Sequence, residues 1–352
     1  MRLPRLFLPT VVLCTLALAS CATTPSGADT RLDRLMAPYT GEVPGASVLV
    51  LRNGQPVVSA AYGLADLEHG TAATPTTNYR LASVSKQFTA AAVLLLAEDG
   101  RLGLDDPVRA WLPGLPASAQ PVTLRHLLTH TSGLVDYEDV MPGGLERQLR
   151  DADVLSILEG QDRTYFEPGS AYRYSNSAYA LLALVVEKAS GRAYPDFLRE
   201  RIFAPLGMDA TLAYVAGGPA VTERAYGHTA SDGGWRRTDQ SPTSAVLGDG
   251  GIYSSIDDLA RWDAALYDDR LLSDASRRLA FAPAVASDEP DVAYGMGWRI
   301  TGDSLWHSGE TIGFRNVLVR WPDEHLTVVV LTNRNAPEPY RLALRIADLY
   351  RD

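Results

Sequence analysis

Strand-like sequence at both ends of the chain, with helical sequence between them, is the feature that most constrains the fold. Residues 45–62 form two β-rich runs around Asn53-Gly54, a dipeptide typical of a tight hairpin turn. From about residue 84 to residue 272 the apolar residues have helical spacing, and helices are expected over 84–98 and 177–190. After residue 292 strand-like runs return, at 294–300, 304–307, 314–321 and 326–332, before a helix at 338–351.

This order predicts an α+β fold whose antiparallel sheet is built from both chain ends. The sheet is expected from about residues 45–62 and 293–333, flanked by helices, with a mostly helical lobe inserted between its two halves. Hydrophobic residues make up 46% of the chain, which is enough for a buried core and excludes a disordered protein.

The N-terminus has the pattern of a bacterial export signal. Arg2 and Arg5 precede an apolar run over residues 6–19, which is short for a transmembrane helix. Residues 18–21 (LASC) resemble a lipobox, so we expect a signal peptide over 1–20 and a lipid-modified Cys21. An ordinary signal peptide cut after Ala19 is the alternative.

Cleavage before Cys21 would leave that residue as the only cysteine, so no disulfide is expected within the mature chain. Residues 21–40 are expected to form a tether, and residues 41–352 a single folded domain. The predicted location is the periplasmic side of a membrane, favouring the outer membrane. Because the net charge is −10 and no basic tract is present, nucleic acid is not an expected partner.

Lysine is rare in this chain, and one of the two lysines lies in a motif that bears chemistry. Ser83 and Lys86 form an S-x-x-K pattern at the start of a helical run, so both face one side of the helix. A neutral lysine amine can accept a serine proton, whereas arginine stays protonated. The alternative is that Ser83 caps the helix and Lys86 is a solvated first-turn residue.

Further motifs follow in a fixed order. They are HLLTHTSGL at 126–134, FEPGSAYRYSN at 166–176, PLGM at 205–208, GDGGIYSS at 248–255 and HSGETIGF at 307–314. With the S-x-x-K pattern, this series resembles the serine β-lactamase-like and penicillin-binding-protein family, which includes class C β-lactamases, DD-peptidases and related esterases. The resemblance spans residues 45–332 and implies that family's fold.

The resemblance also implies roles for individual residues. Ser83 would be the acylated nucleophile and Lys86 its partner, and Tyr174 would relay the proton. These three groups would titrate together, so the sequence leaves open whether Lys86 or Tyr174 is the general base. Asn176 would hydrogen-bond a substrate carbonyl or Lys86, and Tyr172 and Tyr179 are interpreted as packing aromatics.

His307-Ser308-Gly309 falls where the family commonly has K-T-G. Gly309 would let the substrate backbone approach the strand, and the amides of Ser83 and Glu310 would form the oxyanion hole. A histidine near pKa 6.5 is mostly neutral at pH 7, which disfavours recognition of a substrate carboxylate, although Arg315 could restore a cation.

No metal or cofactor is expected. His126 and His130 have a spacing that can bind zinc, but Leu127 stands where a zinc protease has its glutamate, and no third ligand is apparent. Gly248, Gly250 and Gly251 lack the context of a phosphate loop and are interpreted as a loop that borders the cleft.

The sequence therefore predicts a secreted, membrane-anchored serine hydrolase that acts through an acyl-enzyme on a small or peptide substrate with an ester or amide carbonyl. An esterase or a D-amino-acid peptidase is favoured. The alternatives are a β-lactamase or DD-carboxypeptidase, a non-catalytic binder of cell-wall peptides, and a penicillin sensor.

Overall fold

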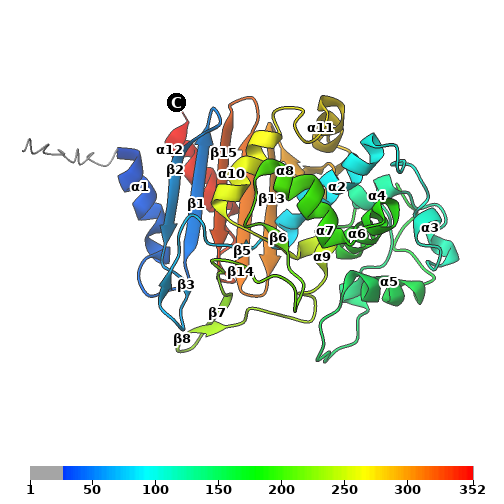
Figure 1. Cartoon of the computed structure of the whole chain (residues 1–352), viewed down its shortest axis with the longest axis horizontal. Coiled ribbons are helices and arrows are strands. Elements are labelled where there is room, and N and C mark those ends of the chain that lie inside the picture. Colours follow the sequence, from blue (N-terminus) through cyan, green and yellow to red (C-terminus); the bar gives the residue numbers. More distant parts are fainter. Residues whose placement is uncertain (1–26, 352) are drawn as a thin grey trace, which may run out of the picture.

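The computed structural model describes residues 27–351, which form an eight-stranded antiparallel sheet with helices on both faces (Figure 1). Along the sheet the strands are β10 (Val285–Ala286), β11 (Ala293–Tyr294), β12 (Arg299–Thr301), β13 (Ser304–Thr311), β14 (Phe314–Trp321), β15 (Leu326–Thr332), β1 (Ala46–Arg52) and β2 (Gln55–Tyr62). The predicted α+β class is confirmed.

The two ends of the chain meet where β1 pairs with β15, with Ala46 opposite Thr332 and Arg52 opposite Leu326. The predicted hairpin joins β1 to β2 through Asn53 and Gly54, whose φ angles are 52° and 72°. Positive φ at both positions gives the turn a twist that matches the strands, which explains why this dipeptide was a reliable signal.

One face of the sheet is covered by α1 (Gly27–Met36) and α12 (Tyr340–Tyr350), which lie beside each other. Leu32 and Met36 of α1 are buried there against apolar residues of β1 and β15. The second half of the predicted tether is therefore helical and packed rather than extended, and the short 3₁₀ turn η1 (Ala37–Tyr39) continues it. Cys21 and the expected signal peptide lie outside the described residues.

The helical lobe packs on the other face, and Figure 1 shows it on the side away from α1. At its centre α2 (Lys86–Glu98) packs against α6 (Asn176–Ser190), and these two helices confirm those predicted over 84–98 and 177–190. The other helices of this face are α3 (Val108–Trp111), α4 (Leu124–Leu128), α5 (Asp151–Glu159), α7 (Tyr194–Leu198), α8 (Ala204–Leu206), α9 (Leu247–Gly250), α10 (Ile256–Ala265) and α11 (Asp274–Phe281).

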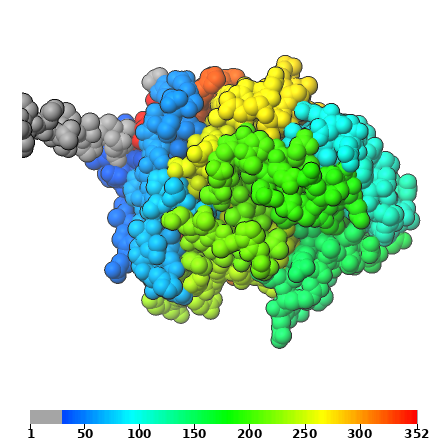
Figure 2. Space-filling model, viewed as in Figure 1, coloured from blue at the N-terminus to red at the C-terminus, as the bar shows by residue number. Residues whose placement is uncertain are grey.

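Small sheets and turns complete the lobe and its border with the main sheet. They are the pair β3 (Leu64–Asp66) and β4 (Thr71–Ala72), the trio β5 (Tyr79–Arg80), β9 (Ile252–Ser254) and β6 (Leu212–Ala213), and the hairpin β7 (His228–Ser231) and β8 (Gly234–Arg237). Figure 2 shows the lobe and the strands joined in one continuous surface on this side. Among residues 27–351 no helix is long and apolar enough to cross a membrane.

The strand predicted at 294–300 is interrupted. Gly297 has a φ of 81°, and a Cβ there would lie 2.8 Å from the Lys86 carbonyl oxygen, so the segment turns against α2 instead of continuing as a strand. The strand predicted at 304–307 instead runs on to Thr311 as β13. Both departures bring sheet residues close to the start of α2.

Candidate active site

Ser83 lies in the 3₁₀ turn η2 (Ala82–Ser85), which leads directly into α2. Ala82 has a φ of 51°, a left-handed conformation that is uncommon for a residue with a side chain. Ser83 is partly exposed, whereas Lys86 is fully buried one turn later. The alternative of a solvated Lys86 is therefore wrong for this fold.

The Lys86 amine has three acceptors, one for each proton of an ammonium group. It donates to Ser83 Oγ at 3.1 Å, to Asn176 Oδ1 at 2.8 Å and to the Asp249 carbonyl at 2.9 Å. The structure thus brings Asn176 to the Ser83–Lys86 pair, from which it is distant in the sequence. Asn176 contacts Lys86 directly, one of the two roles expected for it.

Tyr174 lies beside this group, with Lys86 Nζ 4.9 Å from the centre of its ring. The guanidinium of Arg299, on β12, lies 5.6 Å from the same ring. Ser175 caps the start of α6 by accepting a hydrogen bond from the Ala178 amide, which fixes the segment that carries Tyr174 and Asn176. Tyr179 is buried and donates to the Leu128 carbonyl, in keeping with a packing role.

His307 is buried on β13, with only 1% of its surface exposed. Its Nδ1 lies 2.6 Å from the Ser308 carbonyl, which can only accept, so Nδ1 carries the proton. Its Nε2 lies 3.1 Å from the Tyr294 hydroxyl, which therefore donates to it. Burial holds the pKa of His307 well below its usual range, and Arg299 and Lys86 lower it further. His307 is a neutral ring inside the site.

Gly309 allows the close approach of β13 to η2. A Cβ at this position would lie 2.0 Å from the Leu81 carbonyl oxygen, so no other residue fits without moving one of the two backbones. Gly309 thus makes room for the backbone of Leu81, just before Ser83, rather than for the substrate backbone expected from the sequence. Glu310 follows on the same strand, and its exposed side chain pairs with Arg315 at 2.6 Å.

A small cleft of about 40 Å³ opens at Ser83. Its lining comprises Arg80, Ala82, Ser83, Tyr137, Glu138, Asn176, Thr243, Asp249, Gly250, Glu310 and Thr311. Ser83 and Glu310 border the same space, where the predicted oxyanion amides would act. The glycine-rich segment 248–251 borders the cleft as expected.

Sequence reasoning missed two acidic residues of this cleft, Glu138 and Asp249. Burial raises the pKa of Asp249 to about 8, although the nearby Lys86 lowers it, and the Tyr137 hydroxyl lies 3.2 Å from Asp249 Oδ2. Burial and the neighbouring Asp136 carboxylate raise the pKa of Glu138. Asp249 lies in the glycine-rich motif, which was interpreted only as a loop that borders the cleft. Glu138 belongs to no recognised motif.

The two histidines that could have suggested zinc have separate structural roles. His126 Nδ1 accepts from the Thr123 amide at the start of α4, and His130 Nδ1 accepts from the Ser175 amide. Within residues 27–351 the one close group of three possible metal ligands is Asp66, Glu68 and His69, at the β3–β4 turn and outside the cleft.

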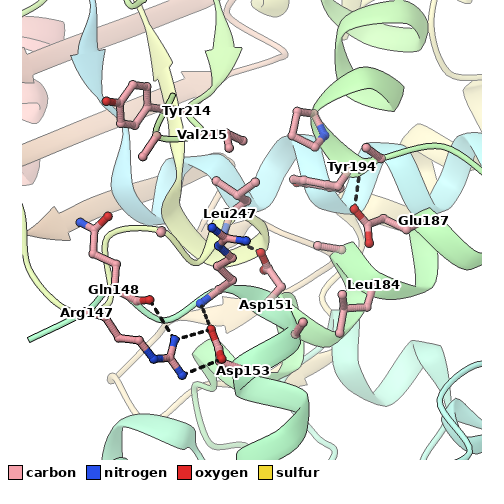
Figure 3. Close-up of a pocket in the computed structure, with 17 residues that line it drawn as sticks. Arg147, Gln148, Asp151, Asp153, Leu184, Glu187, Tyr194, Tyr214, Val215 and Leu247 are labelled. Carbon is pink, nitrogen blue, oxygen red and sulfur yellow. Dashed lines mark hydrogen bonds and ion pairs between the residues drawn. The ribbon is translucent and has the colours of Figure 1, made fainter. Parts of the chain in front are cut away.

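A larger cavity, of about 750 Å³, lies among α5, α6, α7 and α9 and does not include Ser83 (Figure 3). Asp151 lies in its wall and accepts hydrogen bonds from the amides of Leu247 and Gly248. This cavity therefore borders the segment that presents the Asp249 carbonyl to Lys86.

A sequence model of the beta-lactamase family matches residues 29–351, almost all of the described chain. The chain belongs to the beta-lactamase family. Penicillin-binding protein 4* of Bacillus subtilis is 34% identical over 85% of this chain and 70% of its own length. A D-aminopeptidase of Gluconobacter oxydans is 30% identical over 82% of this chain but only 56% of its own length.

Solved structures agree with this membership. A penicillin-binding protein homologue from Pyrococcus abyssi superposes with a TM-score of 0.81 at 26% identity, covering 92% of this chain and 76% of the other. The hydrolase EstCE1 superposes with a TM-score of 0.78 at 25% identity, covering 92% and 98%. The protein is thus a serine hydrolase of the β-lactamase and penicillin-binding-protein type.

Proposed function

We propose that the protein hydrolyses amide bonds of small peptides or amino-acid amides that carry a free amino group, with D-amino-acid derivatives as the first class to test. The observation that carries this proposal is the Glu138 carboxylate, which lines the cleft at Ser83 together with Glu310, whereas buried Asp249, with a pKa raised to about 8, is mostly uncharged at pH 7. A substrate ammonium group would be paired there, whereas a substrate carboxylate would be repelled.

The reaction would begin when Ser83 Oγ adds to the substrate carbonyl carbon and its proton passes to Lys86 or Tyr174. Lys86 Nζ lies 3.1 Å from Ser83 Oγ and is held by Asn176 and the Asp249 carbonyl; to act as the base it must first lose one proton, after which its lone pair can accept the Ser83 proton while the other two contacts are kept. The Ser83 and Glu310 amides would stabilise the oxyanion. The C–N bond then breaks, the amine leaves with the transferred proton, and water hydrolyses the Ser83 ester.

The cations near the site have other partners, which also disfavours carboxylate substrates. Arg315 pairs with Glu310 and donates to the Thr311 and Phe314 carbonyls, so it does not replace the missing lysine of the third motif. His307 is buried and neutral. Arg80, which also lines the cleft, donates to the Gly250 and Ser244 carbonyls, and one of its terminal nitrogens has no hydrogen-bond partner among the described residues.

The names of two relatives also support an amidase or aminopeptidase activity. One curated relative is named a D-aminopeptidase, and another structure of this fold, at 25% identity, is a D-amino acid amidase from Ochrobactrum anthropi. The relative named a penicillin-binding protein favours the second candidate, a β-lactamase or DD-carboxypeptidase.

The test is the ratio of kcat/KM for D-alanine p-nitroanilide to that for its N-acetyl derivative. The wild type should prefer the free amine, and Glu138→Gln should lower the ratio about 10- to 150-fold, since a charge-assisted hydrogen bond contributes roughly 1.5–3 kcal/mol. Glu159→Gln, on the exposed end of α5, is the matched control and should leave the ratio unchanged. Equal turnover of both compounds, or turnover of a chromogenic cephalosporin alone, would contradict the proposal.

We also propose that the mature protein is anchored through a lipid on Cys21 on the periplasmic side of the outer membrane, from the lipobox at residues 18–21. Mass spectrometry of the mature N-terminus should find a diacylglyceryl-modified Cys21. An unmodified Cys21, or cleavage after Ala19, would contradict this.

A further inference from the structure

The segment HLLTHTSGL carries a histidine that the proposed reaction does not use. His130 lies at the end of this segment's helical turn, is 1% exposed and has a φ of 58°. A residue with a large side chain adopts this left-handed conformation only when its surroundings hold it there. The neighbours of His130 therefore indicate what it does.

His130 holds the backbone on both sides of Tyr174. The Arg173 amide donates to the His130 carbonyl at 3.0 Å, and the Ser175 amide donates to His130 Nδ1 at 3.1 Å. These two bonds fix the peptide groups before and after Tyr174. The left-handed backbone of His130 lets its carbonyl and its ring reach the same short segment.

The imidazole ring also packs on the Tyr174 side chain. The two ring centres are 4.4 Å apart with an interplanar angle of 38°, and the Tyr294 ring lies 4.5 Å from the His130 ring centre. Tyr179 closes the pocket at 5.1 Å. His130 thus packs against the ring of Tyr174, which is itself partly exposed.

The charge state of His130 suits this role. Burial holds its pKa well below the usual range, and the nearby Lys86, His307 and Arg299 lower it further. A neutral ring leaves Nδ1 free of a proton, so it can accept from the Ser175 amide. Its other nitrogen, Nε2, is buried without a hydrogen-bond partner among the described residues, so the contacts with Ser175 and Tyr174 are what the ring provides.

We propose that His130 is a positioning residue that fixes Tyr174 and the start of α6 in the arrangement needed for acylation of Ser83. The inference rests on the proposed function only for the role of Tyr174. Among the described residues, His130 forms no hydrogen bond with Ser83 or Lys86. It therefore acts through Tyr174 and Ser175.

Two substitutions separate its contacts. In His130→Asn, Oδ1 takes the place of Nδ1 as acceptor, and asparagine tolerates the left-handed conformation. In His130→Phe the ring is kept but the acceptor is lost, so the Ser175 amide is left unpaired in a buried position. We expect the Asn variant to retain most of the acylation rate and the Phe variant to lose about 100-fold, because a displacement of about 1 Å in a catalytic group has an effect of that size.

The first measurement is the rate of Ser83 acylation by an aryl phosphonate, together with KM for the anilide substrate. A positioning role predicts that His130→Phe lowers the acylation rate while KM stays near the wild-type value. In a Tyr174→Phe background the same substitution should have almost no further effect on the rate. An undiminished rate in His130→Phe, or an equal loss with and without Tyr174, would overturn the inference.

The second measurement does not depend on activity. Hydrogen exchange of the peptide spanning residues 173–178 should be slow in the wild type and in His130→Asn, and faster in His130→Phe. If the wild type were not acylated at all, the proposed function would fail, but this exchange pattern would still test the positioning role. Equal protection in all three proteins would contradict it; if His130→Phe does not fold, His130→Ala, which also lacks the acceptor, replaces it in both measurements and should show the same losses.

Discussion

The contact between Gly309 and the turn before Ser83 allows a quantitative prediction. A Cβ at residue 309 would lie 2.0 Å from the Leu81 carbonyl oxygen and 3.3 Å from Val84 Cγ2, and real Cβ atoms essentially never approach other atoms more closely than 3.0 Å. In Gly309→Ala, β13 must therefore move about 1 Å away from the Leu81 carbonyl, which is the difference between 2.0 Å and the 3.0 Å limit.

This separation moves the Glu310 amide away from Ser83, so both halves of the predicted oxyanion hole lose their spacing. A misplacement of about 1 Å lowers a rate by about 100-fold, equivalent to roughly 2.7 kcal/mol of transition-state stabilisation. Overpacking should also destabilise the fold by about 1–3 kcal/mol. The assay is kcat/KM for D-alanine p-nitroanilide, measured well below the melting temperature of the variant.

Gly233→Ala is the matched control, because a Cβ at residue 233 has no neighbour within 4 Å and the residue lies in the exposed β7–β8 turn. The control should keep wild-type kcat/KM and stability. The reasoning would be refuted if Gly309→Ala acted at the wild-type rate, since β13 would then not set the geometry around Ser83.

Three further predictions concern buried groups. Lys86→Arg should abolish acylation about as completely as Lys86→Ala, because arginine cannot accept the Ser83 proton and its planar group does not match three acceptors around one nitrogen; wild-type labelling of the arginine variant would contradict this. Asp249→Asn should stabilise the protein relative to the wild type by an amount that grows as pH rises from about 4 towards 8 in thermal melts, because burial raises the folded-state pKa of Asp249 from 3.8 to about 8, so the wild type releases this proton on unfolding and loses stability as pH rises; a pH-independent difference would argue against a buried neutral carboxyl. Arg320→Met should lower the free energy of unfolding by about 3 kcal/mol, because it leaves the buried Asp263 carboxylate without the guanidinium now 3.1 Å away, whereas no loss in chemical denaturation would show that the pair contributes little.

The parts of the fold that could be predicted from the sequence are those whose signal is local. The Asn53-Gly54 turn fixes its own hairpin, and the mostly apolar run of β15 follows from burial on both faces of the sheet. The helix α1 was not predicted, because its residues 27–36 are mostly polar and it is stabilised by packing on α12 and the sheet, which are distant in the sequence.

The same distinction applies to the site. Ser83 and Lys86 could be paired from their spacing, because one helical turn brings them together. The role of Asp249 could not, because its carbonyl reaches Lys86 only through the tertiary placement of α9. The orientation of His307 was also beyond the sequence, since it depends on the Tyr294 hydroxyl, which the unexpected turn between β11 and β12 brings within 3.1 Å.

The most direct test of the account is the identification of the residue that becomes covalently modified. The protein would be treated with a fluorescent aryl phosphonate, digested and analysed by tandem mass spectrometry, with Ser83→Ala and Ser85→Ala prepared in parallel. The account predicts a single adduct on Ser83 in the wild type and in Ser85→Ala, and no adduct in Ser83→Ala of unchanged melting temperature. An adduct on another residue, or labelling that persists in Ser83→Ala, would contradict it.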